Sequence, residues 1–224
     1  MNRPRVLIAD DHVLVAQAFC KALEPAYEVV GIVADGRALV SAALKLKPSL
    51  VVCEMSMPVM NGMEAVRLLK PQLPGLIFVF VTMDQDPDLA AAAFRLGVRG
   101  YLLKHSDLDE LPRCLDVVRS GRRYLTPLIA GGNISDLLLE ATGLPNVDAI
   151  SPREREVLQL LAEGHSMVKI ADILQITPRT VAFHKYRLMD RLHLESNSDL
   201  VQFAVRGKLI GGRQDRAGHA GGST

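Results

Sequence analysis

The chain has 224 residues, of which 49% are hydrophobic, with 26 Lys and Arg against 25 Asp and Glu. This length suits one large or two ordinary domains. The net charge of +1 excludes a protein that is polycationic throughout, so charge has to be assessed segment by segment. No apolar run approaches the roughly 18 residues of a membrane span, and the N-terminus lacks a signal-peptide pattern. We therefore expect a soluble cytoplasmic protein with no membrane partner.

The N-terminal half alternates short apolar runs with segments of helical periodicity. The apolar runs, which we interpret as strands, are residues 5–10, 28–33, 50–54, 76–81 and 101–103. Helical stripes lie between them at residues 13–24, 86–96 and 107–119. Two more are marked by Leu39, Ala43 and Leu46 before Pro48, and by Ala65, Leu68 and Leu69 before Pro71. Nearly continuous apolar strands that alternate with helices are typical of a parallel sheet covered on both faces. The pattern predicts a five-stranded, doubly wound, flavodoxin-like α/β domain with right-handed crossovers.

Polar side chains follow the predicted strands at their carboxyl ends. Asp10 and Asp11 end the first strand, Glu54 the third, Thr82 the fourth and Lys104 the fifth. A parallel sheet brings these ends to one edge, where ligands bind in open α/β sheets. Clustered carboxylates suit a hard divalent cation, most simply Mg²⁺. The ammonium would balance negative charge that the metal does not neutralise.

Residues 1–124 resemble a response-regulator receiver domain. The matching segments are IADDH (8–12), MPVMNG (57–62), the strand-ending Thr82 and GYLLK (100–104). The resemblance implies that Asp10, Asp11 and the backbone carbonyl of Ser56 bind the metal. It further implies that Thr82 and Lys104 contact a phosphoryl group, and that Tyr101 swings inward when Thr82 moves. The fold and the switch are thus expectations drawn from these segments together.

Glu54 departs from the family pattern, which has the phosphoacceptor Asp at this place. Its extra methylene moves the carboxylate roughly 1–1.5 Å further into the pocket, toward Lys104. A displacement of that order costs about 10²-fold in a positioned reaction. Three interpretations stay open. Glu54 is not phosphorylated and the protein is regulated otherwise, or Glu54 permanently imitates the phosphorylated state, or it still accepts phosphate.

The segment after the receiver changes in character. Residues 125–149 contain several Pro and Gly residues around a short apolar stretch at 134–139, which predicts a linker with one short helix. Ser151, Pro152 and Glu154 then form a capping box that opens a helix ending near Gly164. Further helices are predicted at about 167–174, 177–192 and 198–206, and residues 150–210 therefore form a four-helix domain with a helix-turn-helix.

Positive charge gathers on the third of these helices. Residues 178–192 hold four basic residues and one acidic residue, a net charge of +3. The domain resembles the LuxR-type helix-turn-helix of the NarL/FixJ class through SPREREVL (151–158), LAEG (161–164), IA (170–171) and TVAFH…LMDRL (180–192). The resemblance implies that this helix enters the major groove of double-stranded DNA and that the protein acts as a homodimer.

The helix also departs from the family at its groove-facing positions. We expect Thr180 and His184 to contact the DNA backbone. The groove-facing positions hold Ala182, Phe183 and Tyr186. Family members often have Lys at the positions of Ala182 and Tyr186. Ala182 and Phe183 offer only apolar contact, such as to a thymine methyl group. The remaining candidate DNA contacts, which would supply affinity through phosphates, are Arg179, Lys185, Arg187 and Arg191.

We interpret the chain as an atypical DNA-binding transcriptional regulator that is not an enzyme and has no catalytic residues. RNA polymerase and a small-molecule ligand are candidate partners, whereas Glu54 argues against control by a sensor kinase. Two alternatives compete with this interpretation: a regulator that binds proteins without reading DNA, and a response regulator that is still phosphorylated. An Mg²⁺-dependent phosphotransferase is disfavoured because the receiver fold lacks an evident substrate cleft. The Gly-rich tail, residues 211–224, is predicted to be disordered.

Overall fold

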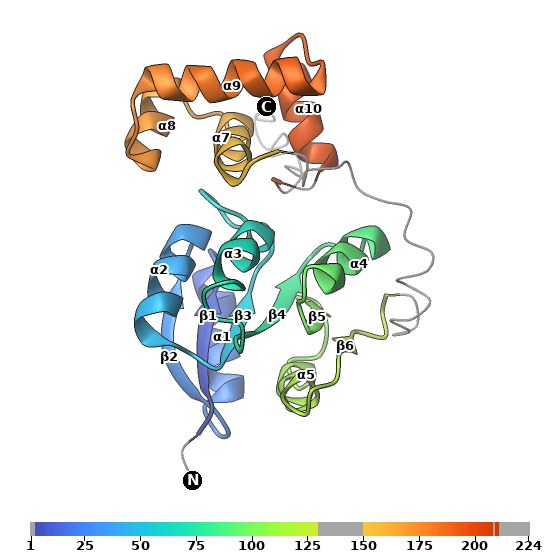
Figure 1. The fold of residues 1–224 in the computed structure, drawn as a ribbon. Helices are drawn as coiled ribbons and strands as arrows, with labels where there is room; N and C mark the ends of the chain where they lie inside the picture. The colour runs from blue at the N-terminus through green and yellow to red at the C-terminus, as the bar shows by residue number, and fades with distance from the viewer. Residues whose placement is uncertain (1–2, 130–149, 208, 211–224) are drawn as a thin grey trace, which may run out of the picture.

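The computed structural model describes residues 3–129, 150–207 and 209–210 (Figure 1). The linker helix predicted at 134–139 and the tail at 211–224 lie outside these residues. Within the described part of the chain, no helix is both long enough and apolar enough to cross a membrane.

The receiver is built on one parallel sheet with the strand order β2-β1-β3-β4-β5-β6. The strands are β1 Arg5–Ala9, β2 Glu28–Val33, β3 Leu50–Cys53, β4 Ile77–Thr82, β5 Gly100–Leu103 and β6 Tyr124–Leu125. The prediction of five strands was wrong by one, because β6 pairs alongside Gly100 and Tyr101 at the edge. A two-residue strand is too short to show any periodicity, so no sequence pattern predicted it.

Five helices cover the two faces of this sheet. They are α1 Val13–Leu23, α2 Gly36–Leu46, α3 Gly62–Leu69, α4 Pro87–Arg95 and α5 Glu110–Arg119. One apolar core packs α2, α3 and α4 against the sheet, and a second packs α1 and α5 against the opposite face. The start of α5 was predicted three residues too early, because the Asp107 carboxylate accepts the N–H of Asp109 and holds a turn there.

The C-terminal domain consists of four described helices: α7 Pro152–Ala162, α8 Met167–Leu174, α9 Pro178–Leu192 and α10 Asn197–Arg206. The predicted capping box at Ser151 and Glu154 is present, and Thr177 caps α9 through the N–H of Thr180. Two small apolar cores hold the helices together, and Val181 and Leu188 anchor α9 to them. Figure 1 shows α7 facing the receiver and α9 on the side turned away from it.

Residues 54–61, which we call the β3–α3 loop, run between Glu54 and Asn61 along the edge where the predicted site lies. The start of α2 packs directly against this loop. A Cβ added to Gly36 would lie 2.2 Å from the backbone oxygen of Met60 and 2.8 Å from its carbonyl carbon. Since both are backbone atoms, a larger residue at position 36 would displace the loop.

We therefore predict that Gly36→Ala destabilises the protein by about 1–3 kcal/mol, the usual range for overpacking a filled site. Urea unfolding followed by circular dichroism measures the change. Gly75→Ala is the matched control, because a Cβ at Gly75 meets nothing within 4 Å. An equal effect of the two substitutions would contradict the packing described for the β3–α3 loop.

Candidate functional site

The five strand-end residues that the sequence singled out lie along the carboxyl edge of the sheet, with Asp10 buried and Asp11 exposed after β1. Asp10 follows β1, Glu54 follows β3, Thr82 ends β4 and Lys104 follows β5. Asp10, Glu54 and Thr82 are each at most 5% exposed. Asp10, Glu54 and Lys104 thus share one buried pocket, with Thr82 at the end of the adjacent strand β4, whereas Asp11, the third carboxylate predicted there, is exposed.

Lys104 holds the two buried carboxylates together. Its Nζ lies 2.7 Å from Glu54 Oε2 and 2.8 Å from Asp10 Oδ2, and it donates a hydrogen bond to Asp10 Oδ1 at 3.0 Å. Burial alone would lower the pKa of Lys104, but the negative charges of Glu54 and Asp10 raise it above its ordinary value. The side chain is therefore an ammonium ion at neutral pH.

The second oxygen of Glu54 is bound by the backbone of the β3–α3 loop. Oε1 accepts the N–H groups of Met55, at 2.6 Å, and Ser56, at 3.1 Å. Together with Lys104 at Oε2, these donors satisfy both oxygens of the carboxylate. Hydrogen bonds to a charged acceptor are among the stronger ones in proteins, so Glu54 fixes the start of the loop.

Asp10, Asp11 and His12 form a group whose ligand atoms all lie within 4.8 Å of one another. His12 Nδ1 lies 2.9 Å from Asp11 Oδ1 and 3.4 Å from Asp10 Oδ1. The sequence prediction missed His12, although it directly follows the two acids in IADDH. Ser56, the predicted carbonyl ligand, is placed at the site by its N–H bond to Glu54.

The donor chemistry of this group fits a hard divalent cation, which prefers carboxylate oxygens. Asp10 Oδ2 is buried and has no hydrogen bond with suitable geometry among the described residues, although Lys104 Nζ lies 2.8 Å away. That oxygen keeps acceptor capacity for a metal. A cation bound by Asp10 and Asp11 would share Asp10 with the Lys104 ammonium.

The two predicted switch residues on β4 and β5 are joined through Asp84. Thr82 Oγ1 accepts the N–H of Asp84 at 3.3 Å, and the Tyr101 hydroxyl donates to the Asp84 carbonyl oxygen at 3.0 Å. Tyr101 is fully buried, and burial raises the pKa of its hydroxyl far above the ordinary value. Tyr101 thus occupies the inward position.

The β3–α3 loop also binds the C-terminal domain through a polar side chain of α7. Gln159 Nε2 donates to the carbonyl oxygen of Met57 at 3.1 Å, and its Oε1 accepts the N–H of Asn61 at 2.9 Å. Glu163 accepts the N–H of Val59 at 3.4 Å. Val59 has a φ of 68°, which is strained for a β-branched residue. The loop therefore carries contacts from Glu54 on one side and from α7 on the other.

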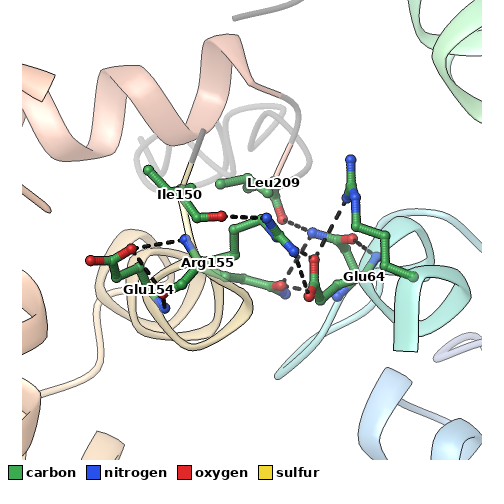
Figure 2. A network of polar contacts seen from close by, with 9 residues as sticks. Glu64, Ile150, Glu154, Arg155 and Leu209 are labelled. Atoms are coloured by element: carbon green, nitrogen blue, oxygen red, sulfur yellow. Dashed lines mark hydrogen bonds and ion pairs between the residues drawn. The ribbon is translucent and has the colours of Figure 1, made fainter. Parts of the chain in front are cut away.

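A buried ion pair joins the two domains beside this loop. Figure 2 shows Arg155 of α7 extending toward Glu64 of α3. Arg155 Nε lies 2.5 Å from Glu64 Oε2, and Nη2 donates to Oε1 at 3.2 Å. The two side chains are 7% and 2% exposed. Arg155 also donates to the Ile150 carbonyl oxygen at 2.5 Å (Figure 2), so most of its donors are used.

A cavity of about 540 Å³ lies between the two domains next to the acidic pocket. Two carboxylates and several apolar side chains surround it. The described lining residues are Asp11, Ser56, Met57, Pro58, Ala162, Glu163, Val201, Val205 and Ile210. Its chemistry would accommodate a small amphipathic molecule.

The predicted DNA-binding residues all lie on α9, but they divide between two environments. Phe183 and Tyr186 are 57% and 62% exposed. In contrast, Arg191 donates to Glu154 Oε2 at 3.2 Å, and Arg187 Nε lies 3.6 Å from Glu154 Oε1. Burial alone would raise the pKa of Glu154, but the Ser151 hydrogen bonds and the two guanidinium groups lower it overall. Arg191 thus links α9 to α7 by a hydrogen bond, whereas the side chain of Arg187 is 54% exposed and has only the longer contact with Glu154.

The other predicted DNA-binding residues of α9 differ in their solvent exposure and hydrogen bonding. Arg179 and Lys185 project from the helix, as exposed and partly exposed residues respectively. Thr180 donates its N–H to the capping hydroxyl of Thr177, and Ala182 is partly exposed. His184 Nδ1 is buried without a hydrogen-bond partner among the described residues.

A sheet edge with this acidic pocket, followed by a helix-turn-helix, defines a two-domain regulator with a receiver and a DNA-binding output. The family model for the response regulator receiver domain matches residues 6–116. The model for bacterial regulatory proteins of the luxR family matches residues 148–204. The chain belongs to the DNA-binding response regulators of the LuxR type.

Relatives match along nearly the whole chain. The response regulator GacA of Pseudomonas protegens is 30% identical over 208 residues, which cover 92% of this chain and 97% of that protein. The transcriptional regulatory protein UhpA of Escherichia coli is 32% identical over 200 residues, 88% of this chain and 95% of UhpA. A structure of the RcsB response regulator of Salmonella typhimurium superposes with a TM-score of 0.61 at 29% identity, covering 92% of this chain and 99% of RcsB.

The Glu64–Arg155 pair predicts that the two domains unfold together. Removing one partner of a buried ion pair costs about 3–5 kcal/mol when the remaining charge is uncompensated, and somewhat less here because Arg67 also lies 3.6 Å from Glu64 Oε2. We expect wild type to unfold in one calorimetric transition and Arg155→Met to lose this cooperativity, with the two domains unfolding in separate steps.

Arg119→Met is the control, because Arg119 contacts Asp116 and the Tyr27 ring within the receiver, whereas Arg153 of α7 shares Glu156 with Arg37 of the receiver. It should keep the single transition. If Arg155→Met also unfolds in one step at the wild-type temperature, the ion pair does not couple the domains.

Proposed function

We propose that this protein is a transcriptional regulator that binds promoter DNA and whose receiver works without phosphoryl transfer to residue 54. The regulatory domain, expected at residues 1–124, would extend to Ile129, because Leu125 pairs in β6 and Ile129 packs in the receiver core. The rest of the expected linker, 125–149, would follow, and 150–210 would be the output domain. The protein would act in the cytoplasm, where the chromosome is accessible, as a homodimer on paired half-sites.

The saturated carboxylate of Glu54 is the observation that carries this proposal. Its two oxygens are bound by Lys104, Met55 N–H and Ser56 N–H, at 2.7, 2.6 and 3.1 Å. In the receiver family, Lys104 would instead contact a phosphoryl group on an aspartate. Here the longer side chain brings its own carboxylate to the ammonium. A phosphodonor would have to displace these contacts before Glu54 could attack it.

A carboxylate is only a partial substitute for a phosphoryl group. It has one negative charge and two acceptor oxygens, whereas a phosphoryl group has nearly two charges and three oxygens. Mg²⁺, when bound by Asp10 and Asp11, would supply additional positive charge at this edge. A sensor kinase is thus not required, and a small molecule in the interdomain cavity is a candidate signal.

A second interpretation is that Glu54 permanently imitates the phosphorylated state. The buried position of Tyr101, hydrogen-bonded to Asp84, supports it. In the family, an inward tyrosine accompanies the movement of the residue at Thr82. Under this interpretation the output domain is competent for DNA without any signal, and the amount of protein sets the response.

On DNA, α9 would lie in the major groove with its N-terminal half toward the bases. A solved RcsB–DNA complex superposes on this chain with a TM-score of 0.56 at 29% identity. Arg179 and Lys185 would supply phosphate contacts, with Thr180 and His184 beside the backbone. Arg187 and Arg191 are expected to contribute less to affinity, because both interact with Glu154. RNA polymerase would be a downstream partner.

We predict that acetyl phosphate and Mg²⁺ add no phosphoryl group to wild type, as read by intact mass, and leave its affinity for promoter DNA unchanged. Glu54→Asp restores the family residue and should gain a phosphoryl group under the same conditions, which serves as the positive control. Glu54→Gln keeps the shape but loses the charge.

The three proteins separate the interpretations. If Glu54→Gln binds DNA about tenfold more weakly than wild type, the permanent-imitation interpretation gains support. If it binds equally well, the charge at residue 54 does not set DNA affinity. Phosphorylation of wild type together with tighter DNA binding would overturn the proposed function.

A further inference from the structure

The exposed face of α9 has an unusual composition for a helix that meets DNA. Residues 179, 182, 183 and 186 are spaced i, i+3, i+4 and i+7 and therefore share one face. This face lies away from Val181 and Leu188, which are buried in the domain. It presents one guanidinium group, one methyl group and two aromatic rings to the surroundings.

Both aromatic rings are exposed to solvent, although burying them would be favourable. Phe183 and Tyr186 are 57% and 62% exposed. Lone exposed apolar residues are ordinary on a protein surface. Two large rings on one face, together with the methyl group of Ala182, instead form a small apolar surface at the part of the helix that is expected to approach base edges.

Neighbouring cations lie over both rings. The Arg187 guanidinium lies over the Phe183 ring at 6.0 Å from its centroid, and Lys185 Nζ lies over the Tyr186 ring at 5.4 Å. The ring of His184 meets Phe183 edge-on, with 5.6 Å between centroids. Since Arg187 also lies 3.6 Å from Glu154, it stands between the ring and the body of the domain. Arg187 is thus a positioning residue for Phe183.

The chemistry of the major groove indicates what this face can recognise. Guanine is recognised by Arg or Lys, adenine by Asn or Gln, and cytosine by Glu or Asp. Apart from Arg179, none of these types stands at the four positions. The apolar group that base pairs present in the major groove is the C5-methyl of thymine, which Ala and Phe contact.

We infer that Phe183, with Ala182 and Tyr186, reads the methyl groups of thymines in the DNA site, so that this regulator prefers thymine at adjacent positions of each half-site. The inference rests on the proposed DNA binding and adds its specificity. Arg179 supplies the one polar contact of this face, to a guanine or a phosphate. Phe183 is the central specificity residue, since it has the largest apolar area on the face.

The test begins by selecting bound duplexes from a random DNA library with the full-length protein. In the selected site, each thymine is then replaced singly by uracil, which removes only the methyl group. Burying one such group changes affinity by about three- to fivefold. We expect that loss at two or more positions of each half-site, measured by fluorescence anisotropy at fixed salt. A duplex with 5-methylcytosine at one of these positions should bind the protein more tightly than the same duplex with unmethylated cytosine there.

Variants assign the effect to the helix face. Phe183→Ala should bind thymine and uracil sites about equally, and because the ring is exposed the domain should keep its fold, as checked by circular dichroism. Lys185→Ala should weaken both sites by the same factor. Tyr186→Phe keeps the ring without its hydroxyl and should preserve the preference for thymine.

Selected sites without thymine at adjacent positions would overturn the inference while leaving DNA binding intact. So would equal affinity of wild type for the thymine and uracil sites. If no sequence is enriched although the protein is folded, both the inference and the proposed DNA binding fail. The aromatic face would then belong to a protein partner.

Discussion

The Lys104 ammonium between Glu54 and Asp10 is the interaction on which the receiver depends. Two carboxylates cannot both stay charged in a buried pocket without a cation, and Lys104 lies within 3 Å of each. The same contact determines what residue 54 can do. Both oxygens of the Glu54 carboxylate are already bound, by the ammonium group at one and by two backbone N–H groups at the other.

The β3–α3 loop contacts both this pocket and the output domain. Glu54 binds its first residues, while Gln159 and Glu163 of α7 bind its later ones. Val59 takes a strained backbone conformation between them, and such strain persists where surrounding contacts impose it. The Glu64–Arg155 pair holds α3 to α7 alongside, with α9 on the outer side of its domain (Figures 1 and 2). The receiver is thus joined to the DNA-binding domain without covering the exposed face of α9.

The sequence alone predicted those features of the fold and of the site that a local residue pattern determines. Alternating apolar runs and helical stripes predicted the sheet, and the residues after each strand predicted the pocket, including the approach of Glu54 to Lys104. Other features had no local signal. Strand β6 has two residues, and the contacts of Gln159 and Arg155 arise only when the two domains meet. The Glu154 contacts that engage Arg187 and Arg191 likewise depend on how α7 packs against α9, which periodicity along one helix does not contain.

In the proposed function, the Glu54 carboxylate takes the contacts with Lys104, Met55 and Ser56 that a phosphoryl group would otherwise need. The most direct measurement is the ¹H–¹⁵N spectrum of the full-length protein with Mg²⁺, before and after addition of beryllofluoride. Solved structures of RcsB include this phosphomimetic. We expect the amide resonances of Met55, Ser56 and Asp84 to keep their positions in wild type, and the same resonances of Glu54→Asp to shift and saturate. Saturable shifts of the same resonances in wild type would contradict the proposed function.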